Sequence, residues 1–265
     1  MLFRSIFLGQ IIQSCYSDFD EMNVSPNNAE EVSPNYLLSY VISKTTMQFY
    51  NLTSENTDIA GLLQYTQRGT EYQSANQNCY QWGKGSWSGY YEILRTNQLM
   101  YELGEKENNP FFMAASLIIK SFTFGLLADL FGDCPYSEAL QASNSVLFPK
   151  YDDQKDVYEG VLNDLKTASK LLEGLEPKLG VLPSSDLLYG GDRDKWIKFA
   201  NSLRLRYSLR LHNKKDQLAI NTENEFKEAA GRVFGSNADN ATLVLLGLSE
   251  DNRSEEHTSE LQSPN

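Results

Sequence analysis

The segment from Phe111 to Phe131 constrains the fold more than any other part of the chain, because it is apolar over a length that could cross a membrane. Lys120 lies at its centre and Asp129 near its end, and each charge at bilayer depth costs roughly 2.5–3.5 kcal/mol. Helices that are apolar on most sides also occur sandwiched between other helices. We therefore predict a buried core helix that begins at Pro110.

Helical spacing of apolar residues continues through much of the remaining chain, with caps such as Ser33-Pro34 and Ser86 and with glycines after the predicted ends. Strand-like alternation is nearly absent. The fold class is therefore all-α, with stacked helix hairpins of tetratricopeptide-like type and long loops, although no clean repeat of about 34 residues is visible. The expected helices run from Pro34 to Phe49, Asn56 to before Gly69, Ser86 to Gly104, Pro110 to Phe131, Asp153 to Gly174, Lys195 to His212 and Glu223 to Phe234.

The charge balance excludes two classes of partner. The chain has 35 acidic and 23 basic residues and a formal net charge of −12, which argues against nucleic acid and against docking on an anionic membrane through a basic patch. The three cysteines, at positions 15, 79 and 134, are too few for a disulfide scaffold and unsuitably spaced for zinc. We expect no metal and no cofactor.

The N-terminus has the layout of a secretory signal: Arg4, a short apolar run to Ile12, and then Gln13-Ser14-Cys15. This order resembles a lipoprotein signal-peptidase box, with residues 1–14 as signal peptide, Cys15 as the lipidated residue and residues 15–33 as an acidic tether. The alternative is a mis-assigned start followed by an ordinary buried cysteine.

The C-terminus differs in character from the rest of the chain. Residues 253–264 read RSEEHTSELQSP, which resembles the in-frame translation of a sequencing-library adapter. We therefore expect residues 253–265 to be non-native and residues 34–252 to be an incomplete helical domain, truncated at its C-terminus.

Asp129 to Ala139, DLFGDCPYSEA, resembles the hallmark turn of SusD/RagB-type outer-membrane lipoproteins. Three further stretches agree in order and spacing: Pro149 to Asp152 before a helix containing NDLKTA, Trp196 to Arg206, and Cys15 followed by NVSPN. The resemblance implies a surface-exposed, outward-facing lipoprotein, anchored in the cell outer membrane by its lipid. Such proteins work as the lid of a SusC-type TonB-dependent transporter and hold an oligosaccharide or other nutrient without cleaving it.

Most residues of these motifs are predicted to be structural. Gly132 can end the helix in a left-handed conformation and Pro135 prevents its continuation. We expect Asp129, Asp133 and Glu138 in this turn to pair with Arg204, Arg206 and Arg210 of one later helix, rather than to form a calcium or catalytic site. Cys134 is predicted to be a small buried residue and not a nucleophile. The structural set is Asp129, Gly132, Asp133, Pro135, Tyr136, Glu138, Asn201, Arg204 and Arg206.

No nucleophile elbow, zinc-protease motif or phosphate-binding loop is present, so we predict a binding protein and not an enzyme. Sugars need aromatic rings for their CH faces and planar polar groups for their hydroxyls. The irregular segment before Trp87 offers both, whereas Trp87 itself falls on the apolar face of the next helix. Trp82 is the leading ligand candidate, and its alternative role is to plug the core. The full candidate set is Trp82, Tyr80, Asn76, Asn78 and Gln81.

Two functions remain open from the sequence. One is the glycan-binding lid, whose partners would be the transporter, a polysaccharide or oligosaccharide and the outer membrane. The other is a helical-repeat scaffold that binds a peptide or protein.

Overall fold

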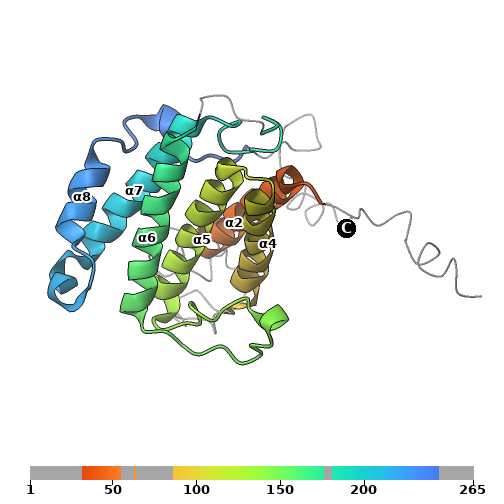
Figure 1. Cartoon of the computed structure of the whole chain (residues 1–265). Coiled ribbons are helices and arrows are strands. Elements are labelled where there is room, and N and C mark those ends of the chain that lie inside the picture. Colours follow the sequence, from red (N-terminus) through yellow and green to blue (C-terminus); the bar gives the residue numbers. More distant parts are fainter. Residues whose placement is uncertain (1–31, 55–62, 64–85, 176–180, 245–265) are drawn as a thin grey trace, which may run out of the picture. The chain divides into compact units, whose positions relative to one another are not determined.

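In the computed structural model, helices that follow one another in sequence also lie side by side (Figure 1). The structure describes residues 32–54, 63, 86–175 and 181–244. These residues form six α-helices, three short 3-10 helices and one isolated β-bridge, so the all-α prediction is confirmed. All six helices belong to the unit Pro34–Asn265. They are α2 (Pro34–Ser54), α4 (Ser88–Lys106), α5 (Pro110–Phe131), α6 (Gln154–Glu173), α7 (Arg193–Leu211) and α8 (Thr222–Ala230).

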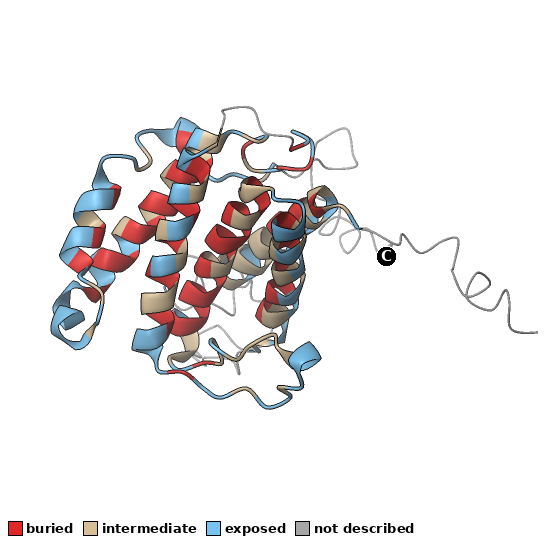
Figure 2. Ribbon diagram, in the orientation of Figure 1, coloured by how far each residue is buried: buried red, intermediate tan, exposed pale blue. Residues whose placement is uncertain are grey.

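Helix α5 is the core of the bundle. It contacts α2, α4, α6 and α7, and Figure 2 shows buried residues along its length. Among the described helices it is the one long and apolar enough to cross a membrane, yet 83% of its most apolar window is buried inside the protein. The prediction of a buried core helix is confirmed.

The α4–α5 hairpin is fixed by local capping and by a buried polar pair. The Asn109 side chain accepts a hydrogen bond from the Phe111 amide at 3.2 Å, with Pro110 in the first turn of α5. Deeper in the hairpin, Ser116 Oγ donates to the Asn97 carbonyl at 2.8 Å, and Asn97 Nδ2 donates to the Ser116 carbonyl at 3.0 Å. These reciprocal bonds satisfy polar groups that would otherwise be costly inside an apolar interface.

Several predicted helix ends differ from the structure by a few residues; α2, for example, continues past Phe49 to Ser54. Helix α4 begins at Ser88 and continues past Gly104 to Lys106. Gly104 is instead buried inside the helix, where a side chain would press on Phe112 of α5. Helix α8 ends at Ala230, followed by Gly231, and does not reach Phe234. The predicted helix near Asn56 lies outside the described residues, as does most of the apolar run from Thr242 to Leu248.

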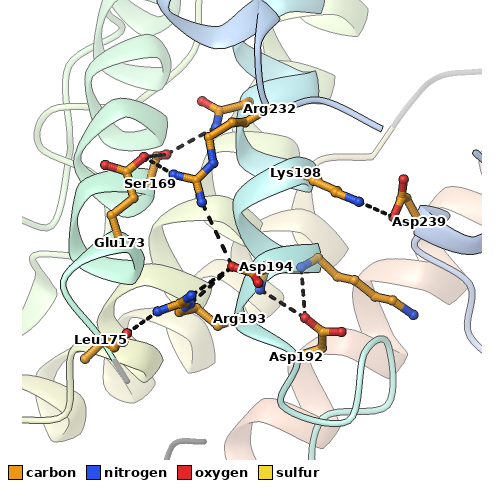
Figure 3. A network of polar contacts seen from close by, with 11 residues as sticks. Ser169, Glu173, Leu175, Asp192, Arg193, Asp194, Lys198, Arg232 and Asp239 are labelled. Atoms are coloured by element: carbon orange, nitrogen blue, oxygen red, sulfur yellow. Dashed lines mark hydrogen bonds and ion pairs between the residues drawn. The ribbon is translucent and has the colours of Figure 1, made fainter. Parts of the chain in front are cut away.

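Surface ion pairs attach the segment after α8 to α6 and α7 (Figure 3). Arg232 pairs with Glu173 at the end of α6 at 2.7 Å and lies 4.0 Å from Asp194 in the first turn of α7. Lys198 of α7 pairs with Asp239 at 2.7 Å, and Asp239 also accepts hydrogen bonds from two backbone amides. The backbone of residues 232–239 is therefore held against the bundle although it is not helical over most of its length.

A glycine in α5 provides a test of the packing. The Tyr207 hydroxyl of α7 lies where a Cβ on Gly125 would be, so Gly125→Ala forces the two helices apart. We expect a loss of about 1–3 kcal/mol in the free energy of unfolding, measured by urea denaturation.

Gly231→Ala is the matched control. Gly231 has φ −75°, and no heavy atom lies within 4 Å of the point that a Cβ would occupy, so alanine fits there without strain. This substitution should change the free energy of unfolding by no more than about 1 kcal/mol, and the change can be an increase. Equal stability of the two variants would contradict the close α5–α7 approach.

Candidate functional site

The turn after α5 is held by hydrogen bonds to the segment that precedes α6. Gly132 has φ 76°, a left-handed conformation that favours glycine, and it ends α5 as predicted. Asp133 Oδ1 accepts a hydrogen bond from the Gln154 amide at 2.9 Å, and Glu138 Oε2 accepts one from the Lys150 amide at 3.0 Å. These two carboxylates therefore bind backbone amides of residues 150–154, and the predicted pairing with arginines is wrong for both.

Asp152 organises the same turn, although nothing in the sequence separates it from its neighbour Asp153. Its carboxylate accepts hydrogen bonds from the amides of Tyr136 and Ser137, at 3.0 and 2.7 Å, and from Ser137 Oγ at 2.8 Å. Its backbone forms the β-bridge to Cys134. Burial raises the pKa of Asp152, but the hydrogen bonds from Ser137 and Tyr136, together with Lys150, outweigh that effect and leave the pKa lowered.

Asp186 is a second buried carboxylate that holds a loop, in this case the one before α7. It is 2% exposed and accepts hydrogen bonds from three backbone amides, those of Leu188, Tyr189 and Gly191. It also accepts one from Trp196 Nε1 at 2.8 Å. Asp186 was not predicted, because a lone acid between Ser185 and Leu187 has no distinctive local pattern.

The three arginines of α7 that were predicted to pair with the turn, Arg204, Arg206 and Arg210, do not act together. Arg210 pairs with Asp129, which also accepts a hydrogen bond from the Tyr158 hydroxyl, so this predicted pair is present. Arg204 instead pairs with Glu225 and Glu228 of α8. Residues two apart on a helix lie about 200° apart around its axis, so neighbouring arginines of the motif cannot share one partner. Arg206 is exposed, and it lines an apolar cavity of about 390 Å³ between α2, α5 and α7.

Arg204 is the centre of a buried polar cluster that joins three helices. Its side chain is 5% exposed, and it binds Glu225 Oε2 through Nε at 3.1 Å. Asn201 Oδ1 accepts a hydrogen bond from Arg204 Nη1 at 3.1 Å, and Asn201 Nδ2 donates one to Ser169 Oγ of α6 at 3.3 Å. Lys166 of α6 pairs with the other oxygen of Glu225 at 2.7 Å. The cluster is structural: it fixes α8 against α6 and α7.

Cys134 is a free, fully buried thiol, as predicted. Burial raises the pKa of this thiol to about 11, so it is protonated and a poor nucleophile near neutral pH. Pro135, next to it, presents its carbonyl to the Tyr91 hydroxyl at 2.7 Å. Among the described residues no group of three or more His, Cys, Asp or Glu side chains could hold a metal ion.

Tyr136 of the turn packs against both an apolar and a charged side chain of α5. Its ring packs edge-on against Phe124, with centroids 4.7 Å apart, and its hydroxyl donates to Asp164 at 3.3 Å. The Lys120 ammonium lies 5.2 Å from the ring centroid and pairs with Asp164 at 2.8 Å. Burial, reinforced by Asp164, raises the pKa of Tyr136, which therefore stays a neutral hydrogen-bond donor.

The predicted ligand and anchor residues lie outside the described part of the chain. This applies to Cys15, the predicted site of lipidation, and to the whole candidate ligand set of Asn76, Asn78, Tyr80, Gln81 and Trp82.

Described aromatic residues follow directly after that segment. Trp87 packs against the core, as predicted, but it is only half-buried. It stacks on Phe131 with ring centroids 5.2 Å apart, and Tyr151 meets it edge-on at 5.5 Å. Tyr151 is 63% exposed. The sequence did not indicate this cluster, because its three members come from separate segments.

Comparison with known proteins identifies structural relatives. Residues 26–259 match a SusD-like family model described as starch-binding and associating with the outer membrane. A SusD homologue from Bacteroides fragilis NCTC 9343 is 32% identical, with a TM-score of 0.68 over 84% of this chain and 46% of its own. A second homologue from the same strain is 25% identical, with a TM-score of 0.62 over 79% of this chain and 43% of its own.

A chitin-binding protein is also similar, with 27% identity and a TM-score of 0.60 over 79% of this chain and 45% of its own. None of the curated proteins matches the chain. The chain thus spans about half the length of the solved structures that it resembles.

The hydrogen bonds to Asp152 predict a specific acid sensitivity. Asp152→Asn should lower the free energy of unfolding at pH 7 by about 1–3 kcal/mol, because the amide cannot accept all the hydrogen bonds of the carboxylate. The pKa of Asp152 is lower in the folded than in the unfolded protein. Its carboxylate therefore contributes fully to the free energy of unfolding above its pKa in the unfolded protein, and the contribution is lost as pH falls through its pKa in the folded protein. The difference between wild type and variant should therefore shrink below about pH 4 in chemical denaturation.

Asp153→Asn is the control, because Asp153 is exposed and its side chain makes, with the described residues, a surface ion pair to Lys155 at 3.8 Å and no capping hydrogen bond. This substitution should change the free energy of unfolding at pH 7 by less than about 1 kcal/mol. A variant at position 152 that is as stable as this control would show that the carboxylate does not hold the turn.

Proposed function

The chain belongs to the SusD-like family, and on that premise we propose that it is a glycan-binding lipoprotein on the outward face of the outer membrane. The observation that carries the proposal is the family match over residues 26–259, together with the structural likeness to a SusD homologue at 32% identity. The likeness to a chitin-binding protein supports a polysaccharide as the ligand class.

Ligand binding is assigned to the segment that contains Trp82, Tyr80, Asn76, Asn78 and Gln81. Aromatic rings supply flat apolar area for the CH face of a sugar, and amides bind its hydroxyls in two directions. The cluster of Trp87, Phe131 and Tyr151 supports this assignment, since it supplies partly exposed aromatic surface and Trp87 follows the same segment in sequence.

The binding is proposed to be non-catalytic and to serve uptake. Membership of a family described as starch-binding favours capture over cleavage. We infer that the partner is a SusC-type TonB-dependent transporter, over which this protein works as a lid, and that the lipid on Cys15 holds it at the membrane. The chain spans less than half of the length of its solved relatives, so the partner and the ligand of a whole protein of this family are part of the proposal.

Trp82→Ala tests the ligand assignment. If Trp82 stacks on a sugar, its loss should weaken binding of the 265-residue chain to starch or chitin by about fivefold or more. The measurement is retardation in native gels that contain each polysaccharide, with the melting temperature recorded in parallel. We expect the melting temperature to change little.

Trp87→Ala is the comparison variant, because Trp87 packs on Phe131 and contributes to the core. It should lower the melting temperature clearly, since truncation of packed aromatic residues costs about 3–5 kcal/mol at full burial and less at half burial. If Trp82→Ala shows this stability loss and unchanged retardation, Trp82 is a core residue and the assignment fails.

Cys15→Ala tests the anchor. In a Gram-negative host that processes lipoproteins, wild-type chain should sediment with outer membranes and begin at Cys15 by mass spectrometry, with attached acyl chains. The alanine variant should move to the soluble fraction, whereas Cys79→Ala should behave as wild type. Membrane-free wild-type protein with an intact Met1 would contradict lipidation.

A further inference from the structure

A second, polar cavity lies between α4, α5 and the loop that follows Tyr136. Its volume is about 380 Å³, near the lower end of the range of roughly 300–1,000 Å³ that small-molecule sites occupy. It therefore suits a small ligand, or the end of a larger one, and not the middle of a polymer. Its described lining comes from three elements: Gln98 and Glu102 of α4, Lys120 of α5, and Tyr136, Ser143 and Asn144 of the loop.

One wall of this cavity is rigid and partly aromatic. The ring of Tyr136 is fixed between Phe124 and the Lys120–Asp164 ion pair. Gly160 of α6 makes room for it, because a Cβ at that position would collide with the Tyr136 hydroxyl. The wall thus offers apolar ring surface whose position does not depend on the ligand.

The remaining lining supplies uncommitted polar groups. Gln98 donates one hydrogen bond to Glu102 at 3.0 Å through its amide nitrogen, and its amide oxygen accepts none from the described residues. Within the described part of the chain, the side chains of Ser143 and Asn144 make no hydrogen bond, and both residues are exposed. Such donors and acceptors are available to a ligand without breaking an existing contact.

The loop also holds two residues in left-handed backbone conformations that are unusual for their type. Leu140 has φ 64° and Ser145 has φ 67°. Such conformations are strained for residues other than glycine, and such residues cluster at ligand sites. Leu140 itself lines the cavity, and Ser145 follows directly after Asn144.

The charge of the lining restricts the ligand further. Among the described lining residues the cation is Lys120, which Asp164 neutralises, while Glu102 adds a negative charge. An anionic ligand such as a phosphate or an acidic sugar would be repelled. We propose that this cavity binds one neutral sugar ring, with its CH face on the aromatic wall and its hydroxyls on Gln98, Asn144 and Ser143.

This proposal rests on other side chains than the residues assigned above: Gln98, Tyr136, Ser143 and Asn144 belong to the described residues, whereas Asn76, Asn78, Tyr80, Gln81 and Trp82 lie outside them. The choice of a sugar as probe rests on the proposed function, but the cavity, its free polar groups and its charge do not. The two proposals can therefore fail independently.

Ligand-detected nuclear magnetic resonance on the 265-residue chain tests the proposal, with D-glucose, N-acetylglucosamine and D-glucuronate as probes. We expect saturable binding of at least one neutral sugar and binding of glucuronate that is about fivefold weaker or absent. The double variant Gln98→Ala/Asn144→Ala should raise the dissociation constant of the neutral sugar about fivefold or more, because each lost hydrogen bond changes affinity severalfold.

Asn163→Ala/Gln217→Ala is the matched control, since both residues are exposed amides outside the cavity lining. It should bind the neutral sugar as wild type does, and both double variants should keep the wild-type melting temperature.

Absence of saturable binding for both neutral sugars, or equal dissociation constants in the two double variants, overturns the proposal. If starch or chitin still retards the chain in that case, only the cavity assignment fails. If neutral sugars bind through the cavity and neither polysaccharide retards the chain, the proposed function fails instead.

Discussion

Burial of α5 on several sides at once is the constraint on which the rest of the structure depends. A helix of 22 residues with fifteen of them buried needs neighbours all around it, and α2, α4, α6 and α7 supply them. Thr123 donates to the carbonyl of Ile119 within the helix at 2.9 Å, whereas Ser116 exchanges hydrogen bonds with Asn97 of α4, and Ser121 donates to the carbonyl of Val161 of α6 at 3.4 Å. Where α7 approaches closely, Gly125 removes the side chain that would prevent it.

Apolar burial sets which helices meet, whereas polar contacts at the edges set how they are aligned. Hydrophobic contact is not directional, so it specifies register only weakly. The Arg210–Asp129 pair connects α7 to the end of α5, and the Arg204 cluster connects α8 to α6 and α7. Buried ion pairs add little net stability when their desolvation is counted. We therefore expect these clusters to contribute mainly to alignment.

The apolar core could be predicted from the sequence, because helical periodicity depends on local spacing. Other local signals predicted the core helix α5 from its long apolar run, the start of α2 from Ser33-Pro34 and the end of α6 from Gly174. Partners far apart in sequence could not: Arg204 and Glu225 are 21 residues apart, and nothing local shows which of several acids an arginine reaches. The polar cavity was missed for the same reason. Gln98, Lys120 and Asn144 are unremarkable in their own segments, and only the return of the loop after α5 places them around one space.

These observations separate the residues that make the fold from those that can vary with the ligand. The core of α5 and the carboxylates Asp152 and Asp186 hold backbone in place, so changes there alter the whole bundle. The polar lining of the cavity, by contrast, includes amides and hydroxyls that are exposed or half-buried and lie outside the apolar core. A scaffold arranged in this way can exchange Gln98, Ser143 or Asn144 at little cost in stability. Ligand specificity at this cavity can therefore change by substitution of these residues while α5 and its neighbours stay the same.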